Sequence, residues 1–312
     1  MVHFSAPGSV VLSGEYGLLF GKPAIAAAID ARIDIGFTNS KKKDRLDDIS
    51  LFVINETKRY LQDRNLFALN KWYPLRVVNA IPEDDTFGYI DAKITALIAL
   101  VIYAYSKRKF ASEEIPSIAY SIEKKINHTS LGIHCTASCL GGLIYYRREF
   151  EFLKHISSLN IRIPDVIEKH LFFVDTGKAE ESDGELENLV GKAFNVSTKR
   201  TEAIFQEMEK TTKRLTVSIA KEDGSFFKEC LKLNEGLLEK LGVVSGYTRK
   251  IIRNLEQIGS AKIIGNGGKK KKSGFLLVYS KDENELKKIT NTYNISYFPF
   301  HQSAKGLVRN TL

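Results

Sequence analysis

The sequence has few cysteines and no long apolar run. Its 312 residues include three cysteines, two methionines, one tryptophan and seven prolines. Three cysteines are too few for a disulfide framework, so we expect a reducing compartment, the cytoplasm. The longest apolar run, residues 94–105, is about a third too short to span a bilayer, and residues 1–20 lack the regions of a signal peptide. We therefore expect a soluble protein with no membrane partner.

What the sequence does contain is enough apolar residues for a large core and an excess of positive charge. The hydrophobic content is 43%, and 46 basic residues against 37 acidic ones give a net charge of +9. This charge favours anionic ligands, and part of it lies in the runs Lys41–Lys43 and Lys269–Lys272. There is no solenoid repeat and no recognised nucleic-acid motif, so we expect no specific nucleic-acid partner.

The spacing of apolar residues predicts both helices and strands. Strands are predicted at residues 10–12, 24–29, 31–37, 49–54, 75–80, 171–174, 260–264 and 275–279. Helices are predicted at residues 56–65, 89–105, 113–127, 195–219 and 227–241. The mixture indicates an α+β protein, and the length favours two domains.

The stretch Ala6–Asp30 predicts a buried strand, a tight turn and a second strand at the start of the chain. Glu15 and Tyr16 directly follow Gly14 at the end of the first strand, where side chains are held firmly and can face a ligand. The alternative is that both are ordinary polar groups at a turn.

This stretch resembles the first signature of the GHMP kinases, the family of galactokinase, homoserine kinase, mevalonate kinase and phosphomevalonate kinase. Its sequence is APGSVVLSGEYGLLFGKPAIAAAID. That signature reads P-G-K-x-x-L-x-G-E-H or P-G-K-x-x-L-x-G-E-Y, and its lysine is Ser9 here. The continuation GKPAIAAAID is most similar to the mevalonate kinase branch. The resemblance implies that Glu15 and Tyr16 bind substrate and that Ser9 occupies a catalytic position.

A second region, residues 82–92, lies where the family has the glycine-rich loop P-x-G-x-G-L-G-S-S-A-A, which binds the phosphates of ATP. Only Gly88 remains here, and the family's magnesium-binding serine is Ile90, which cannot bind a metal ion. Asp84, Asp85 and Thr86 are strong N-cap residues, so we interpret the loop as a helix start capped by its own acidic groups, which would repel a triphosphate. The alternative is a working phosphate site at Gly88.

Residues 131–148 resemble the family stretch P-S-G-I-D-x-x-x-S-x-x-G-G, whose aspartate is the catalytic carboxylate. That aspartate is His134 here, and an imidazole can act as a general base near neutral pH. Glu123 lies eleven residues earlier, the spacing of the magnesium-binding glutamate in mevalonate kinases, although a helical glutamate is more often solvated. His134, Cys135 and Cys139 could also bind a metal ion, but three ligands without a fourth are a weak signal.

The second half of the chain carries two further similarities. The phrase FVDTGKAEES places Thr176 where mevalonate kinases approach their substrate. The phrase GNGGKKKK keeps part of the third family signature, G-A-G-G-G-G, and thereby assigns Gly267 and Gly268 to nucleotide binding. Lysines at 269–272 replace its remaining glycines; they attract anions, or they are simply solvated.

The resemblance covers essentially the whole chain and implies a two-domain GHMP-kinase-like fold with a ligand cleft between the domains. The predicted domains are residues 1–165 and residues 166–312, the second of the split β-α-β type. The implied cofactors are ATP and Mg²⁺, the implied partner is mevalonate or a phosphorylated derivative, and a homodimer is one assembly that it allows.

Three functions remain open from the sequence. The first is ATP-dependent phosphoryl transfer to the mevalonate hydroxyl by an enzyme with weakened or lost activity. The second is a catalytically silent relative that acts as a binding or regulatory module. The third is an enzyme that acts on an already phosphorylated mevalonate.

Overall fold

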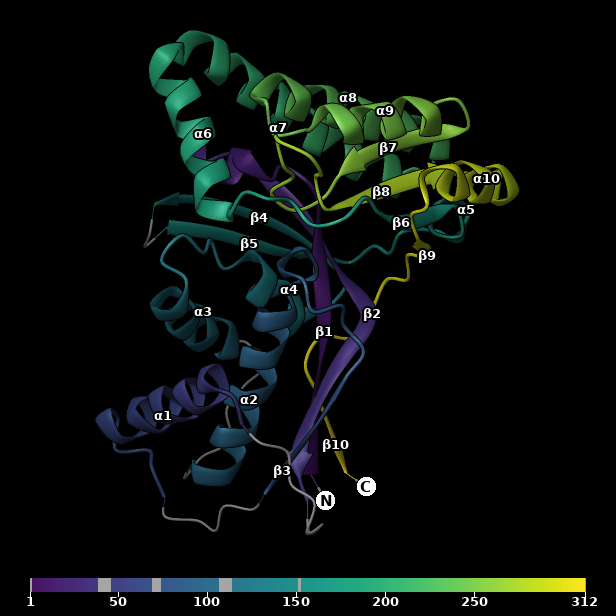
Figure 1. Ribbon diagram of the computed structural model, residues 1–312. Helices are drawn as coiled ribbons and strands as arrows, with labels where there is room; N and C mark the ends of the chain where they lie inside the picture. The colour runs from purple at the N-terminus through teal and green to yellow at the C-terminus, as the bar shows by residue number, and fades with distance from the viewer. Residues whose placement is uncertain (1, 39–45, 69–73, 107–113, 151–152, 312) are drawn as a thin grey trace. The chain divides into compact units, whose positions relative to one another are not determined.

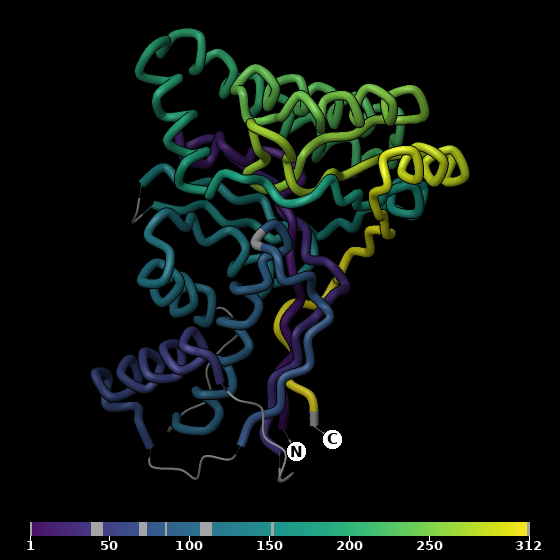
Figure 2. Tube along the Cα trace, viewed as in Figure 1, coloured from purple at the N-terminus to yellow at the C-terminus, as the bar shows by residue number. Residues whose placement is uncertain are grey.

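The structure is a computed structural model, which describes residues 2–38, 46–68, 74–106, 114–150 and 153–311. Figure 1 labels its helices and strands, and Figure 2 follows the same chain as a tube from its purple N-terminus to its yellow C-terminus. The lysine run at 41–43 and most of the loop expected around it lie outside the described residues.

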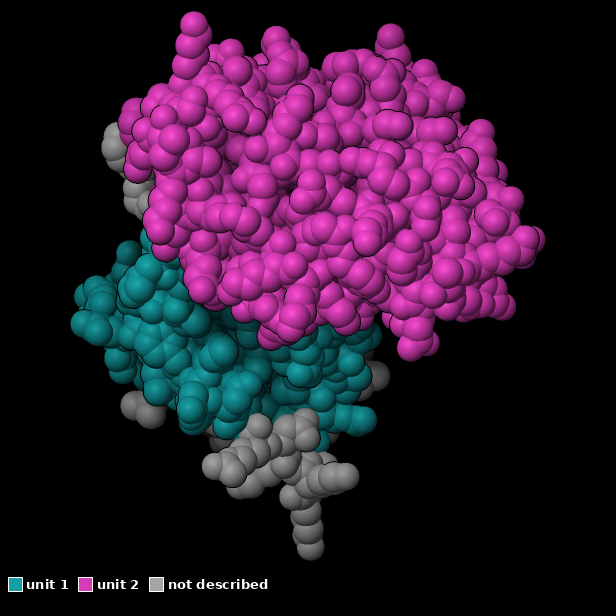
Figure 3. Space-filling model, turned by 45° about the horizontal axis from the view of Figure 1, so that its top comes forward, with its two compact units in different colours: residues 1–9, 27–144, 303–312 teal, residues 10–26, 145–302 magenta. Residues whose placement is uncertain are grey.

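The chain divides into two compact units, which Figure 3 draws in different colours. Unit 1 consists of residues 1–9, 27–144 and 303–312, and unit 2 consists of residues 10–26 and 145–302. The two units interleave along the sequence because strands β1, β2 and β4 each have residues in both. The predicted boundary between residues 165 and 166 stays a prediction about domains.

The opening stretch folds as a strand, a turn and a strand. Strand β1 (Val2–Ser13) leads into the 3₁₀ helix η1 (Tyr16–Phe20), and β2 (Ala24–Phe37) follows. Residues 4–13 of β1 and residues 24–29 of β2 are buried, and most of them are small or β-branched. The predicted hairpin is confirmed, but the segment 31–37 is the second half of β2 and not a separate strand.

Strands β1 and β2 form the centre of a six-stranded sheet with the order β10-β1-β2-β4-β5, and β3 also pairs with β2. The antiparallel pairs of β1 with β10 and of β2 with β3 lie within unit 1. The remaining strands are β3 (Leu75–Asn79), β4 (Leu143–Phe150), β5 (Leu153–Leu159) and β10 (Val308–Thr311).

Four helices complete unit 1 and lie together beside strands β1–β3 in Figure 1. Helix α2 is apolar around its whole circumference, which is typical of a helix covered on all sides. Helices α1, α3 and α4 all pack against it. The four helices are α1 (Asp48–Asp63), α2 (Tyr89–Tyr105), α3 (Ile115–Ile126) and α4 (Ile133–Leu140).

The predicted strand at 49–54 is wrong, because these residues form the first half of α1. Asp47 caps the helix by accepting a hydrogen bond from the Ser50 amide at 2.8 Å. Val53, Thr57 and Leu61 are buried at helical spacing along one side. The cap and the period of four therefore override the β-branched residues that suggested a strand.

Unit 2 contains a four-stranded antiparallel sheet with the order β7-β8-β6-β9. Because β8 lies between β6 and β7, the helices that connect β6 to β7 join two strands that are not neighbours. This is the split β-α-β arrangement. Its strands are β6 (Leu171–Asp175), β7 (Gly259–Ile263), β8 (Phe275–Ser280) and β9 (Tyr297–Pro299).

The connection from β6 to β7 consists of four helices. The long helix predicted at 195–219 is interrupted at Ser197, and residues 195–196 belong to a preceding helix that begins with a capping box between Ser182 and Glu185. The helices of unit 2 are α5 (Asp165–Glu168), α6 (Asp183–Val196), α7 (Thr198–Ala220), α8 (Gly224–Leu241), α9 (Gly246–Leu255) and α10 (Glu283–Tyr293).

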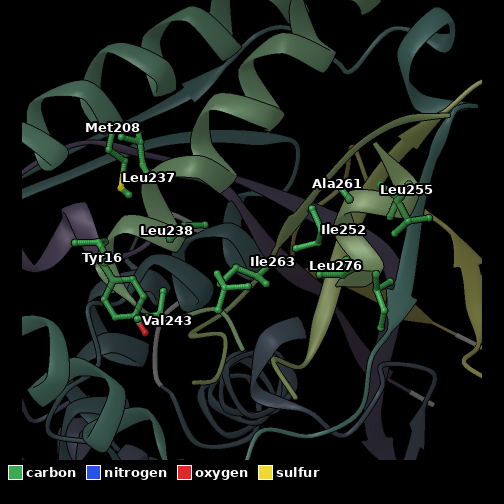
Figure 4. Close-up of a cluster of buried hydrophobic side chains, with 14 of the residues drawn as sticks. Tyr16, Met208, Leu237, Leu238, Val243, Ile252, Leu255, Ala261, Ile263 and Leu276 are labelled. Carbon is green, nitrogen blue, oxygen red and sulfur yellow. The ribbon is translucent and has the colours of Figure 1, made fainter. Parts of the chain in front are cut away.

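The core of unit 2 lies between this sheet and the helices α7, α8 and α9. Its side chains come from η1, the helices and the inner face of the sheet, and each buried leucine or isoleucine contributes on the order of 1.5–3 kcal/mol. Figure 4 labels Tyr16, Met208, Leu237, Leu238, Val243, Ile252, Leu255, Ala261, Ile263 and Leu276. Among the described residues, no helix is both long and apolar enough to span a membrane.

Candidate functional site

The start of α2 differs from the predicted acid-capped helix. The residue before the helix is Gly88, with φ 60° and ψ 36°, and no side chain caps the first turn. The Asp84 carboxylate instead accepts a hydrogen bond from the Thr86 amide at 2.9 Å, within its own turn. Asp91 is 9% exposed and belongs to the cluster described below. The interpretation that Asp84 caps this helix is therefore wrong.

Ser9 and His134, which are 125 positions apart, come together beside Gly88. Ser9 Oγ lies 2.9 Å from His134 Nδ1, and Ser9 is completely buried. A Cβ atom added to Gly88 would lie 2.8 Å from Ser9 Oγ and 3.0 Å from His134 Nδ1. Both the positive φ and this close approach require glycine at position 88. All three residues belong to unit 1.

His134 reaches this position because α4 begins one residue before it. Gly132 precedes the helix with φ 78°, and a Cβ atom there would collide with the Tyr120 ring. Farther along α4, Ser138 Oγ donates a hydrogen bond to the Pro7 carbonyl at 2.7 Å. This contact holds α4 against β1 close to Ser9.

A second group of polar side chains in unit 1 comes from three different helices. Asp91 of α2, Glu123 of α3 and Cys135 of α4 each offer a ligand atom, and these atoms lie within 4.8 Å of one another. Ser130 Oγ donates a hydrogen bond to Glu123 Oε1. Burial and the nearby Asp91 charge raise the pKa of Glu123 well above its usual range, although hydrogen bonds from Ser130 and Cys135 oppose this shift.

The possible metal cluster of His134, Cys135 and Cys139, for which the sequence provided only a weak signal, does not form. Successive residues of a helix point about 100° apart, and His134 bonds to Ser9 while Cys135 lies beside Glu123. Cys139 Sγ lies 3.7 Å from Thr95 Oγ1. Sequence analysis missed Asp91 as a member of the second cluster, because the acidic residues around the first turn of α2 were interpreted together as negative charge at a helix start.

Glu15 and Tyr16, the predicted substrate-binding residues, are both buried in unit 2. Glu15 forms an ion pair with Lys262, and both side chains are nearly inaccessible. Asn234 Nδ2 also donates to Glu15 Oε2, at 3.4 Å. Tyr16 donates its hydroxyl proton to the Asn266 carbonyl at 2.6 Å, and burial raises the pKa of Tyr16 far above its usual range. Their substrate-binding role stays a prediction.

Lys262 is the residue of this network that sequence analysis did not single out. It lies within the buried strand β7, where a lysine is unusual unless a carboxylate accompanies it. Glu235 lies close by and accepts a hydrogen bond from the Ile263 amide at 2.8 Å. Burial raises the pKa of Glu235 to about 8. A charged residue inside an apolar strand was the signal that could have identified Lys262.

The predicted nucleotide-binding glycines lie in a turn that is held by hydrogen bonds within unit 2. A Cβ atom at Gly267, which has φ 71°, would collide with the Val243 carbonyl, and one at Gly268 would collide with the Lys272 carbonyl. Ser273 Oγ donates to the Gly268 carbonyl at 2.8 Å. These contacts explain the two glycines without a nucleotide, so their nucleotide-binding role stays a prediction.

The lysine run after this turn is exposed, and Lys271 forms an ion pair with Glu180. Thr176, the third predicted substrate-binding residue, is buried, and its hydroxyl donates to the Gly274 carbonyl at 2.5 Å. Thr176 therefore supports the far end of the same turn. Its contact with a substrate also stays a prediction.

The ion Mg²⁺, which the family resemblance implies at Glu123, does not fit the residues around that side chain. Mg²⁺ takes oxygen ligands in near-octahedral geometry and keeps several bound waters. Glu123 is 8% exposed and shares its cluster with the fully buried thiol of Cys135. A buried set of donors that includes sulfur is poorly suited to a hydrated magnesium ion, and we derive no reaction step through it.

Curated relatives of the chain are mevalonate kinases, although no protein-family model matches it. The chain is 28% identical over 301 residues to mevalonate kinase of Pyrococcus abyssi, an alignment that covers 86% of both proteins. It is also 28% identical over 297 residues to mevalonate kinase of Pyrococcus horikoshii, with 85% of each covered.

Solved structures agree with this similarity. Mevalonate kinase of Methanococcus jannaschii superposes with a TM-score of 0.74 at 18% identity, covering 97% of this chain and 98% of the other. Phosphomevalonate kinase of Streptococcus pneumoniae, in complex with phosphomevalonate and AMPPNP, gives 0.73 at 14% identity, with coverage of 97% and 100%. Over most of its length the chain is therefore similar to GHMP kinases, and in particular to mevalonate kinases.

The predicted fold class and the resemblance to the mevalonate kinase branch of the GHMP kinases are thereby confirmed. The similarity to mevalonate kinases supports a kinase-like function. In this chain, Ser9 and His134 stand at the two positions where the GHMP kinase pattern has lysine and aspartate. The structure joins these two positions by a hydrogen bond.

Proposed function

We propose that this protein transfers the γ-phosphoryl group of ATP to the hydroxyl of mevalonate, with His134 as the general base. The observation that carries the proposal is the contact of Ser9 Oγ and His134 Nδ1 at 2.9 Å beside Gly88. The family pattern pairs a lysine and an aspartate at these two positions. In this chain the residues at the same positions, Ser9 and His134, are still in contact. A neutral hydrogen-bonded pair here takes the place of an ion pair.

The proposed chemistry places the two imidazole nitrogens in different roles. Nδ1–H donates to Ser9 Oγ, and this tautomer leaves a lone pair on Nε2. Nε2 takes the proton of the acceptor hydroxyl while the oxygen of that hydroxyl bonds to the γ-phosphorus of ATP. The bond from that phosphorus to the bridging oxygen breaks, and ADP leaves. Ser9 is a positioning residue, because it selects the tautomer without touching the reacting atoms.

The start of α2 supports an anionic ligand beside this pair. The first turn has no side-chain cap, and unpaired amides at a helix N-terminus favour negative charge. Gly88 keeps the approach to these amides free of a side chain. Asp84, one of the residues expected to cap the helix, bonds within its own turn instead, which removes one objection to phosphate binding.

A specific observation also favours a catalytically silent relative. Phosphoryl transfer relies on positively charged groups and a metal ion that balance the developing charge. Ser9 supplies no cation, and the donors around Glu123 do not suit Mg²⁺. In that case the chain would bind a ligand without turning it over. An acceptor that is already phosphorylated is less favoured, because Lys271 is paired with Glu180 and the run is exposed.

A coupled assay for ADP release tests these alternatives with the full-length protein. ATP is supplied with mevalonate, with phosphomevalonate or with no acceptor, and we expect release that depends on mevalonate. The His134→Ala variant should lower kcat by about 10²–10⁴-fold, the usual contribution of a general base. The His128→Ala variant, which changes an exposed histidine of the same unit, is the matched control and should keep wild-type activity.

Each alternative outcome has a definite meaning. Release that depends on phosphomevalonate would replace the proposed acceptor. No release, together with no shift of the melting temperature by millimolar ATP or mevalonate, would reject the kinase proposal and leave the silent module. Unchanged kcat in a folded His134→Ala protein would reject His134 as the base.

A further inference from the structure

Helix α4, which carries His134 in its first turn, is held at its other end by residues from the far end of the chain. The Leu307 amide donates to the Cys139 carbonyl at 3.0 Å, and the Gly142 amide donates to the Ser303 carbonyl at 2.8 Å. We call residues 303–307 the C-terminal segment; like α4, it belongs to unit 1. Two main-chain hydrogen bonds therefore join the end of α4 to the C-terminal segment.

Two glycines bring these main chains into direct contact. A Cβ atom added to Gly306 would lie 2.2 Å from the Cys139 carbonyl oxygen and 2.5 Å from the Leu140 carbonyl carbon. One added to Gly141 would lie 2.2 Å from the Gly306 amide nitrogen. The obstacles are main-chain atoms and not flexible side chains, so even a methyl group at position 306 has to push α4 and the C-terminal segment apart.

The C-terminal segment is in turn fixed to the sheet that carries Ser9. The Ser303 amide donates to the Ala28 carbonyl of β2 at 2.9 Å. Arg32 of β2 donates to the Gly306 carbonyl at 2.7 Å, and strand β10, which follows the segment directly, pairs with β1. The C-terminal segment is therefore a spacer of fixed thickness between these strands and the end of α4.

The contact between Ser9 and His134 depends on this spacing. Helix α4 has eight residues and is about 12 Å long, which is short enough for it to move as one body. Ser9 Oγ and His134 Nδ1 are 2.9 Å apart, and a hydrogen bond is lost beyond about 3.5 Å. A displacement of α4 by less than about 1 Å is thus enough to separate the two side chains.

We propose that the C-terminal segment positions His134, and that Gly306 is the positioning residue within it. Gly306 does not act on the reacting atoms. It sets how closely α4 approaches the sheet and thereby holds the imidazole at Ser9. The inference rests on the proposed role of His134 as the general base, but the placement of the imidazole is measurable without turnover.

The test uses the full-length protein with its histidines labelled for nitrogen NMR, and the His134→Ala spectrum identifies the signals of His134. The hydrogen bond of one imidazole nitrogen determines which nitrogen carries the proton, so Ser9→Ala gives the spectrum of His134 without its partner. Gly306→Ala should move the His134 signals from their wild-type positions toward those of Ser9→Ala.

The same variant should affect the chemical step more than binding. Gly306→Ala should lower kcat for mevalonate-dependent ADP release by about 10- to 100-fold, because a small misplacement of a catalytic group slows the reaction by such factors. The KM values for ATP and mevalonate should stay within about twofold of wild type, since the variant removes no contact with either ligand.

Two controls separate positioning from a general loss of stability. Val53→Ala, which removes buried methyl groups from α1 of the same unit, should destabilise the protein and leave the His134 signals and kcat unchanged. Gly236→Ala adds a Cβ atom where nothing lies within 4 Å and should also change neither. If Gly306→Ala does not fold, Arg32→Lys takes its place, because it loosens the C-terminal segment without adding bulk.

Each outcome decides one point. A folded Gly306→Ala protein, or in its place Arg32→Lys, with the wild-type His134 spectrum would overturn the proposal, and so would equal spectral changes in Val53→Ala. A shifted spectrum with wild-type kcat would support the positioning and reject His134 as the base. If the wild-type protein releases no ADP, the kinase proposal fails by itself, and the His134 spectrum still decides whether the C-terminal segment places the imidazole.

Discussion

Glu15 and Lys262 form an ion pair in the core of unit 2, with side chains that are 4% and 0% exposed. Charges removed from water in this way are stable only while each has its partner. Asn234 and Glu235 of α8 lie beside the pair. At the residue scale, the stability of the folded protein depends on each buried charge of this network keeping its oppositely charged partner.

Lys262→Met should destabilise the protein by about 3–5 kcal/mol, because it leaves the Glu15 carboxylate buried without its cation. The double variant Glu15→Gln/Lys262→Met should be more stable than Lys262→Met alone, since no charge then lacks a partner. Urea unfolding of the three proteins measures the difference. A decrease in the free energy of unfolding below about 1 kcal/mol for Lys262→Met would contradict the claim that the buried Glu15 carboxylate needs its cation.

Glu235 predicts a pH dependence of stability. Burial raises its pKa to about 8 from 4.5, so between these values the folded protein holds a proton that the unfolded chain has lost. Stability should therefore fall as pH rises through this window, by up to about 1.4 kcal/mol per pH unit. Above pH 8 the carboxyl group ionises in both states and the loss stops.

The Glu235→Gln variant removes this proton and keeps an oxygen for the Ile263 amide. Compared with wild type, it should become progressively more stable between pH 5 and pH 8. Urea unfolding at unit steps of pH gives the comparison. If the difference in unfolding free energy between Glu235→Gln and wild type stays constant from pH 5 to pH 8, Glu235 does not titrate in that range.

At the scale of single elements, caps decide where the helices begin. Asp47 starts α1 by accepting from the Ser50 amide, and its other oxygen pairs with Lys93, which is 5% exposed. The same carboxylate thus fixes the first turn of α1 and ties that helix to α2. Ser182 and Glu185 have a comparable role at the start of α6.

Two substitutions of Asp47 separate its two roles. Asn at position 47 can still cap the helix but carries no charge for Lys93, whereas Ala provides neither. Asp47→Ala should therefore be less stable than Asp47→Asn by about 1 kcal/mol, the usual value of an N-cap. Thermal unfolding of both variants tests this, and equal stability would mean that the cap contributes nothing.

At the scale of the whole molecule, Arg32 ties the two ends of the chain together within unit 1. Its guanidinium donates to Ser5 Oγ and the Ser5 carbonyl near the N-terminus, and to Ser303 Oγ and the carbonyls of Lys305 and Gly306 near the C-terminus. Strand β10 then pairs with β1 antiparallel, with His3 opposite Asn310. One planar side chain with several donors serves both segments.

Arg32→Ala should destabilise the protein by at least about 2 kcal/mol, because several acceptors lose a charged donor. Arg32→Lys should restore only part of this, since one ammonium group cannot donate to both segments. Hydrogen exchange of the amides in residues 303–311 should be faster in both variants. Arg59→Ala, which changes an exposed arginine of α1, should not alter this exchange.

Much of the fold could be predicted from local sequence. Helix α2 occupies the predicted residues 89–105, and β3, β6 and β8 lie within one residue of their predicted bounds. Apolar periodicity sets these elements. Where two local signals competed, prediction failed, as at α1, whose β-branched residues suggested a strand before the Asp47 cap was considered.

The candidate site was predictable only in part. The family resemblance identified Ser9 and His134 as a pair, but the hydrogen bond between them depends on how α4 packs against β1. Asp91 was not singled out from the sequence, and its side chain lies beside Glu123 and Cys135. A sequence states which groups are present in a turn, but the neighbouring helices decide which of them face each other.

The sequence by itself determined the order of the elements, the opening strand–turn–strand and the resemblance to GHMP kinases, because these follow from short-range periodicity and from sequence motifs. The tertiary structure alone decided which charged and polar groups meet. Glu15 finds Lys262 across 247 positions and Ser9 finds His134 across 125. Such pairs form because a buried polar group must be satisfied by whatever the folded chain brings beside it, and no local pattern records that choice.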